Sequence, residues 1–247
     1  MTELAYMIRS DWAQHGTAMG EQSAKIRAWL GEPPFIFFTP RLARFNDRNS
    51  ADREFAEFVA PDDATRHVFE IGELADVRNS DGIDSAVTII HPFEPRDCER
   101  LLEAVSAKAV ARMFVMVWSE MDRVRVMLDA LDAVDLHAGG RAHAPDAVQL
   151  EAARLMVDEQ YNGLSSGRGK DAVIQLLRAF REEGDPLNER AWLHALYAAG
   201  GTFSSGEAVA RFIAEMKAGT RHRVQERFVP GIVDLLRADA HRSAGVV

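Results

Sequence analysis

Apolar residues follow different spacings in different parts of this chain, and the spacing predicts its secondary structure. Over residues 1–31 they recur near a 3.6-residue period, which predicts one bent helix or two helices, since Gly16 and Gly20 interrupt the pattern. After Gly31 the pattern changes to short β-rich runs. These runs predict strands at 35–38, 66–71, 86–91 and 111–118.

Helical patterns fall between or after these predicted strands. They cover residues 51–59, 95–108 and 121–131, and the second begins with Pro95, which is tolerated in a first helical turn. Strands that are apolar on both faces and alternate with helices are typical of a parallel sheet covered by helices. We therefore expect an α/β domain over residues 1–136, a small, mostly parallel sheet sandwiched by helices, with a helical segment at its N-terminus.

The turn-rich segment 137–145 is the predicted linker, and every later pattern is helical. Asn188 is placed to cap one of these helices, and the pair Ser204 and Glu207 has the spacing of a capping box. The sequence thus predicts an all-helical bundle over 146–247, with helices at 146–160, 170–182, 188–199, 205–218 and 230–240.

Composition excludes several classes of protein. The longest strongly apolar run, 113–118, is far shorter than the roughly 20 residues that cross a bilayer, so no membrane partner is expected. The first residues lack the pattern of a secretory signal, which makes the cytoplasm the expected location. The single Cys98 rules out an intramolecular disulfide framework or a cysteine zinc cage, and its place on an apolar helix stripe predicts a core residue.

The formal charge of −9 is carried entirely by the N-terminal part of the 247-residue chain. Residues 1–140 hold 15 Lys and Arg against 24 Asp and Glu, whereas the remainder holds 14 of each. Whole-chain acidity argues against a general nucleic-acid coat protein, because non-specific affinity comes mainly from cations on phosphates. The net charge does not exclude a local contact between a basic segment and nucleic acid.

The residues after each predicted strand are the first candidates for a ligand site. In open α/β sheets ligands bind beyond the carboxyl ends of the strands. A histidine there can move protons near neutral pH, with a carboxylate to assist it, and an arginine can anchor an anion. The candidates are His91 and Glu94 as catalytic residues, and Thr39, Arg41, Ser119 and Glu120 as ligand-binding residues. The alternative is that strand ends simply turn polar on leaving the core.

A glycine-rich stretch, 161–171, can aim backbone N–H groups at an anion, with Arg168 and Lys170 adding charge. It is not a P-loop, because Gly163 and Gly169 are six residues apart and Asp171 stands where a hydroxyl should bind magnesium. An ordinary helix start explains the same residues.

Acidic residues at 70, 73, 76, 81 and 84 suggest a divalent cation, but they lack the spacing of a known calcium loop. A turn at 79–82 explains one of them. We therefore predict no metal site, and the sequence identifies no cofactor.

The segment 217–227 carries the densest positive charge and suggests contact with phosphates of a nucleic acid. Its cations in the prediction are Lys217, Arg221, Arg223 and Arg227. A solvated helix end or a protein-docking surface accounts for them equally well.

Three functions are consistent with these patterns. The first is a binding or regulatory module, with an α/β ligand-binding domain and a helical domain that contacts a phosphate-rich partner or nucleic acid. The second is an enzyme acting on a small polar or phosphorylated metabolite, with His91 as acid–base group and Arg41 as anchor. The third is a structural or protein-interaction component of an assembly.

Overall fold

The computed structural model describes residues 2–9, 19–79 and 86–244. It divides into two compact units, Met1–Ala142 and His143–Val247. Within the described residues, no helix is both long enough and apolar enough to cross a membrane.

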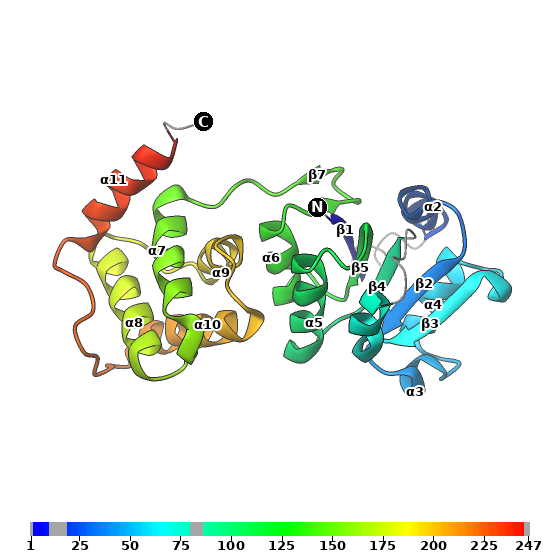
Figure 1. Cartoon of the computed structure of the whole chain (residues 1–247), viewed down its shortest axis with the longest axis horizontal. Coiled ribbons are helices and arrows are strands. Elements are labelled where there is room, and N and C mark those ends of the chain that lie inside the picture. Colours follow the sequence, from blue (N-terminus) through cyan, green and yellow to red (C-terminus); the bar gives the residue numbers. More distant parts are fainter. Residues whose placement is uncertain (1, 10–18, 80–85, 245–247) are drawn as a thin grey trace. The chain divides into compact units, whose positions relative to one another are not determined.

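The first unit is built on a seven-stranded sheet with the strand order β3-β2-β4-β5-β1-β6-β7 (Figure 1). All neighbouring strands run parallel except the last pair. The strands are β1 (Glu3–Ile8), β2 (Phe35–Thr39), β3 (Arg66–Glu70), β4 (Val87–Ile90), β5 (Arg112–Val117), β6 (Val134–Asp135) and β7 (Gly140–Arg141). The prediction of a mostly parallel α/β sheet is confirmed, and its four strands correspond to β2 through β5.

The N-terminal residues are a strand, so the prediction of helix from residue 1 is wrong there. Residues 3–8 form β1, which pairs with both β5 and β6 and is buried at five of its six positions. A short apolar run such as Leu4 to Ile8 fits a buried strand as well as a buried helix, and only its partners decide. The rest of the prediction holds from Met19 to Leu30, which form helix α2; Gly16 lies outside the described residues.

Helices cover both faces of the sheet (Figure 1). They are α2, α3 (Leu42–Phe45), α4 (Ala51–Val59), α5 (Pro95–Ser106) and α6 (Arg123–Ala130), with 3-10 helices η2 (Asp63–Thr65) and η3 (Ile71–Asn79). Ile26 of α2 and Phe55 of α4 share one core cluster with Met7 and Phe114 of the sheet. On the opposite face Tyr6 of β1 donates to Asp129 of α6 at 2.7 Å. Successive side chains of β1 thus point to opposite faces of the sheet, one packed against α2 and α4 and the other against α6.

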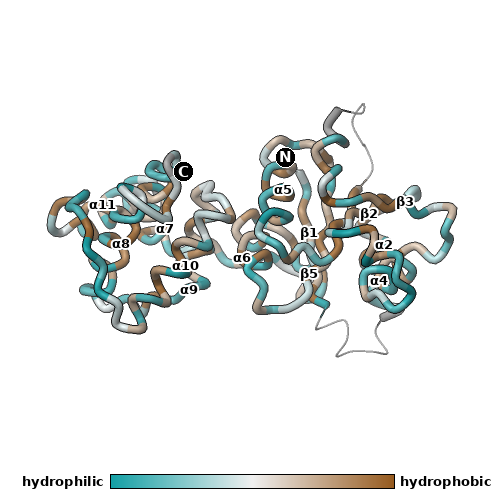
Figure 2. The backbone as a smooth tube through the Cα atoms, turned by 90° about the horizontal axis from the view of Figure 1, so that it is seen from below, coloured by the Kyte–Doolittle hydropathy of each residue, from teal (hydrophilic) through white to brown (hydrophobic). Residues whose placement is uncertain are grey.

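Hydropathy along the backbone agrees with this arrangement (Figure 2). Strand β2 is an apolar run, whereas helices α2 and α4 contain both apolar and hydrophilic residues. Strand β4 is buried at all four positions between β2 and β5. Because parallel strands end at one edge, the residues that follow β2, β4 and β5 lie along the same edge of the sheet.

Part of the predicted linker 137–145 belongs to the sheet. Gly140 and Arg141 form β7, which pairs antiparallel with β6. The Asp135 carboxylate accepts from the backbone N–H groups of His137 at 2.8 Å and Ala138 at 3.1 Å, which closes the connection. The expectation that β structure ends before His137 is therefore wrong, because a hairpin this short has no recognisable periodicity.

The second unit contains helices and no strand within residues 143–244. The predicted helices correspond to α7 (Ala147–Asp158), α8 (Gly167–Glu182), α9 (Glu189–Ala198), α10 (Phe203–Lys217) and α11 (Ile232–Ala244), with a 3-10 turn η4 (Gln160–Asn162). Helix α7 contacts α8, α9 and α11, and α10 contacts α8 and α9. Asn188 caps α9 as predicted. Helix α10, however, is capped by Thr202, whose hydroxyl accepts from Ser205 N–H, so the capping box predicted at Ser204 is wrong.

Candidate functional site

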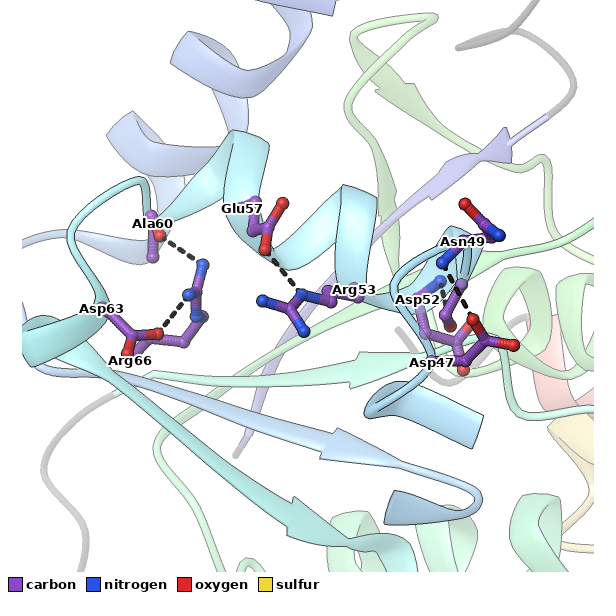
Figure 3. Close-up of polar contacts among 9 residues, drawn as sticks. Asp47, Asn49, Asp52, Arg53, Glu57, Ala60, Asp63 and Arg66 are labelled. Atoms are coloured by element: carbon purple, nitrogen blue, oxygen red, sulfur yellow. Dashed lines mark hydrogen bonds and ion pairs between the residues drawn. The ribbon is translucent and has the colours of Figure 1, made fainter. Parts of the chain in front are cut away.

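Helix α4 carries a carboxylate on its buried face. Ser50 caps the helix, its hydroxyl accepting from the backbone N–H of Asp52 at 3.2 Å. Asp52 is buried together with Phe55, Ala56 and Val59, so it occupies the first position of the apolar stripe. Arg53 and Glu57 form an ion pair at 2.7 Å and are more exposed (Figure 3). The amphipathic helix thus presses an acidic side chain against the sheet.

His91 directly follows β4 and has an unusual backbone conformation. Its φ is +43°, a left-handed value that costs a side chain with a Cβ of order 1–2 kcal/mol. Its N–H still continues the sheet by donating to Met116 O at 2.9 Å. Strain of this kind persists only where the surrounding structure over-determines it, and it is found often at functional sites.

Asp52 and His91 form a buried pair at the carboxyl edge of the sheet. The Asp52 Oδ1 and His91 Nδ1 atoms are 2.6 Å apart, and the two residues are 2% and 3% exposed. The Thr39 hydroxyl donates to Asp52 Oδ2 at 3.1 Å. Since a carboxylate only accepts, it places the imidazole proton on Nδ1 and leaves a lone pair on Nε2.

The other imidazole nitrogen, Nε2, makes no hydrogen bond within the described part of the chain that would hold the ring in place. His91 Nε2 is buried and has no hydrogen-bond partner among the described residues. Burial lowers the pKa of His91, an effect that the bond to Asp52 opposes and the positive charges of Arg9 and Arg44 reinforce. The neutral imidazole is therefore favoured near pH 7, with an acceptor on Nε2.

Aromatic rings line the same imidazole. The ring centroids of His91 and Trp118 are 4.9 Å apart at an interplanar angle of 86°, an edge-to-face contact. The Phe55 ring lies 6.4 Å away, tilted by 48°. Trp118 follows β5 directly and is 46% exposed, whereas Phe55 is fully buried. The imidazole thus contacts a buried ring from α4 and a partly exposed ring that follows β5.

Cations gather at the same edge of the sheet. Arg9, which follows β1, forms an ion pair with Glu54 of α4. Arg41 pairs with Glu94 at 2.7 Å, with both side chains exposed. The Arg44 guanidinium lies 5.8 Å from the centroid of the Phe93 ring. Glu94 therefore binds Arg41, and the carboxylate that contacts His91 is Asp52.

Ser119 and Glu120 lie in the turn that leads into α6. Ser119 N–H donates to Asp122 Oδ2 at 2.9 Å, and its hydroxyl accepts from Met121 N–H at 3.2 Å. Glu120 is exposed. Of the residues expected to bind a ligand, the structure brings Thr39 into the hydrogen-bonded network of His91, while Ser119 is used within its own turn.

The remaining acidic and thiol candidates bond locally. Glu73 accepts from Glu70 N–H at 2.9 Å, and Glu70 accepts from Leu42 N–H at 3.0 Å. Asp81 and Asp84 lie outside the described residues, and within the described part no group of three potential metal ligands occurs. Cys98 is buried, 1% exposed.

The glycine-rich stretch of the second unit is tightly packed at Gly169. A Cβ added at Gly169 would overlap the carbonyl oxygen of Gly163. Arg168 is exposed and Lys170 half-buried in the first turn of α8. The close approach of two backbones explains why glycine stands at 169.

The four cations of the basic segment have different surroundings. Lys217 ends α10, and it is exposed, as are Arg221 and Arg223. Arg227 forms an ion pair with Glu159, and its backbone N–H donates to Gln175 Oε1 at 2.7 Å. Arg227 therefore ties this segment to α7 and α8, and exposed cations are found at the other three positions.

Sequence reasoning missed Asp52 and Trp118. The sequence pattern contains one indication of Asp52. An acidic residue occupies the first position of the stripe formed with Phe55, Ala56 and Val59, where an apolar residue is expected. Nothing local links it to His91, which is 39 residues away. A scan against models of protein families and searches of the curated proteins and of the solved structures found no match for this chain.

Proposed function

We propose that the first unit is an enzyme in which His91 accepts a proton from a small polar substrate. The observation that carries this proposal is the buried Asp52–His91 pair, whose outer nitrogen Nε2 has no partner among the described residues. Carboxylate–imidazole pairs of this kind hold the ring in one tautomer and stabilise the imidazolium that forms on proton transfer. This favours the enzyme, an alternative in the sequence analysis, over the binding or regulatory module, which was the leading expectation there.

The reaction class follows from the groups at hand. A proton passes from an O–H, N–H or activated C–H bond of the substrate, or from water, to His91 Nε2, and the electron pair stays on the atom that loses it. Thr39 is not the nucleophile, because its hydroxyl proton is directed at Asp52. Base-catalysed hydrolysis or isomerisation of a small molecule fits these constraints.

Activity-based screening tests this proposal. The full chain is incubated with a mixture of defined small metabolites, and consumption is followed by mass spectrometry, in parallel with His91→Gln and with His67→Gln, an exposed histidine on β3. We expect at least one compound to be converted by wild type and His67→Gln, and about 10²-fold or more slowly by His91→Gln. No conversion by wild type, or equal conversion by His91→Gln, rejects the enzyme in favour of a binding role.

We further propose that residues 146–247 form a helical bundle that folds independently. The contacts of α7 with α8, α9 and α11 support this, as does the buried Trp192 at its centre, 0% exposed. Brief limited proteolysis should cut first between 137 and 146 and leave a stable fragment on each side. Earliest cuts within 32–136, or loss of either fragment, would contradict it.

A further inference from the structure

Exposed aromatic surface and positive charge occur together near His91. Trp118 contacts the imidazole at 4.9 Å yet is 46% exposed. Phe93, two residues beyond His91, is 49% exposed and lies beneath the Arg44 guanidinium at 5.8 Å. Single exposed aromatic residues are common, but here two of them follow the neighbouring strands β4 and β5, the same strands that position His91.

Arg44 is suited to bind an anion. It is exposed and has no acidic partner within residues 2–9, 19–79 and 86–244. Contact of the guanidinium with the Phe93 ring restrains its orientation, and its N–H groups form a planar fork that matches a phosphate or carboxylate. Arg41, in contrast, is already neutralised by Glu94. In a chain of net charge −9, an unneutralised cation beside the site selects for negatively charged ligands.

Trp118 is suited to bind a flat ring. An indole offers a broad face on which an aromatic ligand stacks, whatever the pattern of its polar edge. Because Trp118 also touches His91, a ring stacked on it lies next to the imidazole. Trp118, directly after β5, thus contacts His91 itself, while Arg44 of α3 contacts Phe93, two residues beyond His91.

Resting on the function proposed above, we infer that the substrate joins an aromatic ring to an anionic group. The ring stacks on Trp118, the anion binds Arg44, and the bond or proton between them faces His91 Nε2. A nucleoside monophosphate, an aryl phosphate and an aromatic carboxylate share this chemistry, and the experiment below separates them.

Indole NMR signals test this assignment directly. The chain has four tryptophans, so tryptophan labelled with ¹⁵N gives few indole N–H signals, and Trp118→Phe assigns the one of interest. The full chain is titrated with AMP, phenyl phosphate and benzoate, and separately with adenosine and inorganic phosphate. We expect at least one of the first three to shift the Trp118 signal saturably, whereas adenosine binds about tenfold or more weakly and phosphate leaves the signal in place.

Single variants test the contributions of Arg44 and Trp118 to binding separately. Arg44→Ala should weaken the binding ligand about tenfold or more, and Trp118→Leu should weaken it to a similar degree by ligand-observed NMR. Arg48→Ala, an exposed arginine of the same segment, is the matched control and should bind as wild type does. Unchanged melting curves show that each variant is folded.

The outcomes separate this inference from the proposed function. If none of the three ring-bearing anions shifts Trp118 at millimolar concentration, or if Arg44→Ala binds as tightly as Arg48→Ala, the substrate class is wrong. Metabolite conversion that depends on His91 would then still uphold the enzyme. Saturable binding that depends on both Trp118 and Arg44, without conversion of any metabolite, upholds the ligand class and rejects catalysis.

Discussion

Two aspartates in the two units share similar hydrogen-bonding patterns with different consequences. Asp185, between α8 and α9, accepts from Gln149 Nε2 at 2.8 Å, from Leu187 N–H at 2.6 Å and from Trp192 Nε1 at 3.4 Å. Asp52 accepts from Thr39 and contacts His91 Nδ1. Amide and indole N–H groups do not transfer protons to a ligand near neutral pH, so Asp185 only fixes the conformation of a loop. An imidazole has a second nitrogen, and in the ring that Asp52 orients this Nε2 has no hydrogen-bond partner among the described residues.

The largest effect expected from this comparison is on stability. Asp52→Ala leaves the Thr39 hydroxyl and His91 Nδ1–H buried without an acceptor, and should lower the free energy of unfolding by about 3 kcal/mol. Asp185→Ala, at a half-buried position, should cost about 2 kcal/mol. Chemical denaturation measures both. Only Asp52→Ala should change the ¹⁵N chemical shifts that report the His91 tautomer; the same change in Asp185→Ala would remove the distinction.

The glycine-rich start of α8 provides a second test. Gly169→Ala forces a Cβ onto the Gly163 carbonyl and should destabilise the helical unit by about 2 kcal/mol. Arg168→Ala, exposed one residue earlier, should change stability by less than about 0.5 kcal/mol. Thermal melting of both variants decides whether this stretch serves packing. Loss of an anion's stabilising effect in Arg168→Ala, with Gly169→Ala tolerated, would favour an anion site instead.

The pH dependence of stability tests which protonation state of His91 the folded chain favours. Its pKa is lowered in the folded chain by burial, so the unfolded chain binds the proton more tightly below about pH 6.5. Stability is therefore complete above that pH and falls as the pH drops, by at most about 1.4 kcal/mol per unit. Between pH 7.5 and 5.5, wild type should lose about 1 kcal/mol more than His91→Gln.

The control for this measurement is His67→Gln, which removes an exposed imidazole from the same unit and should retain the dependence of wild type. A wild type that instead gains stability relative to His91→Gln on acidification would mean that the Asp52–His91 pair favours the imidazolium. His91 would then be a proton donor rather than an acceptor.

The smallest effects are expected in the basic segment. Arg227→Gln removes an ion pair with Glu159 at the surface of the helical unit and should cost no more than about 1 kcal/mol. If Lys217, Arg221 and Arg223 meet nucleic acid, affinity must fall with salt, and each lost phosphate contact must reduce the log–log slope by about 0.7–0.9. A triple alanine variant at these positions, titrated with single-stranded and duplex probes, measures this.

We expect no binding of either probe at about 50 mM salt, because the chain carries a net charge of −9 and no aromatic residue alternates with these cations. Binding by wild type with a slope that becomes shallower in the triple variant would overturn that expectation and assign the helical unit to a phosphate-rich partner.

Local sequence determined most of the secondary structure. Helix α4 begins and ends where its pattern predicts, at Ala51 and Val59, and strands β2 through β5 coincide with β-rich runs. Periodicity sufficed there because each element buries one face or both, and burial dictates which positions are apolar. The candidate His91 was also predictable, since the residue after a parallel strand lies at the edge of the sheet where ligands bind.

Tertiary structure alone decided the rest. Residues 3–8 are a strand because β5 and β6 offer hydrogen bonds on both sides, and an apolar run of six residues carries no preference strong enough to show this. Asp52 contacts His91 because the buried face of α4 packs against the sheet, and Trp118 contacts it because the neighbouring parallel strands β4 and β5 end at one edge. Spacing along the chain indicates neighbours on one element, whereas the surroundings of His91 are formed by residues from α4, from β2 and from the end of β5.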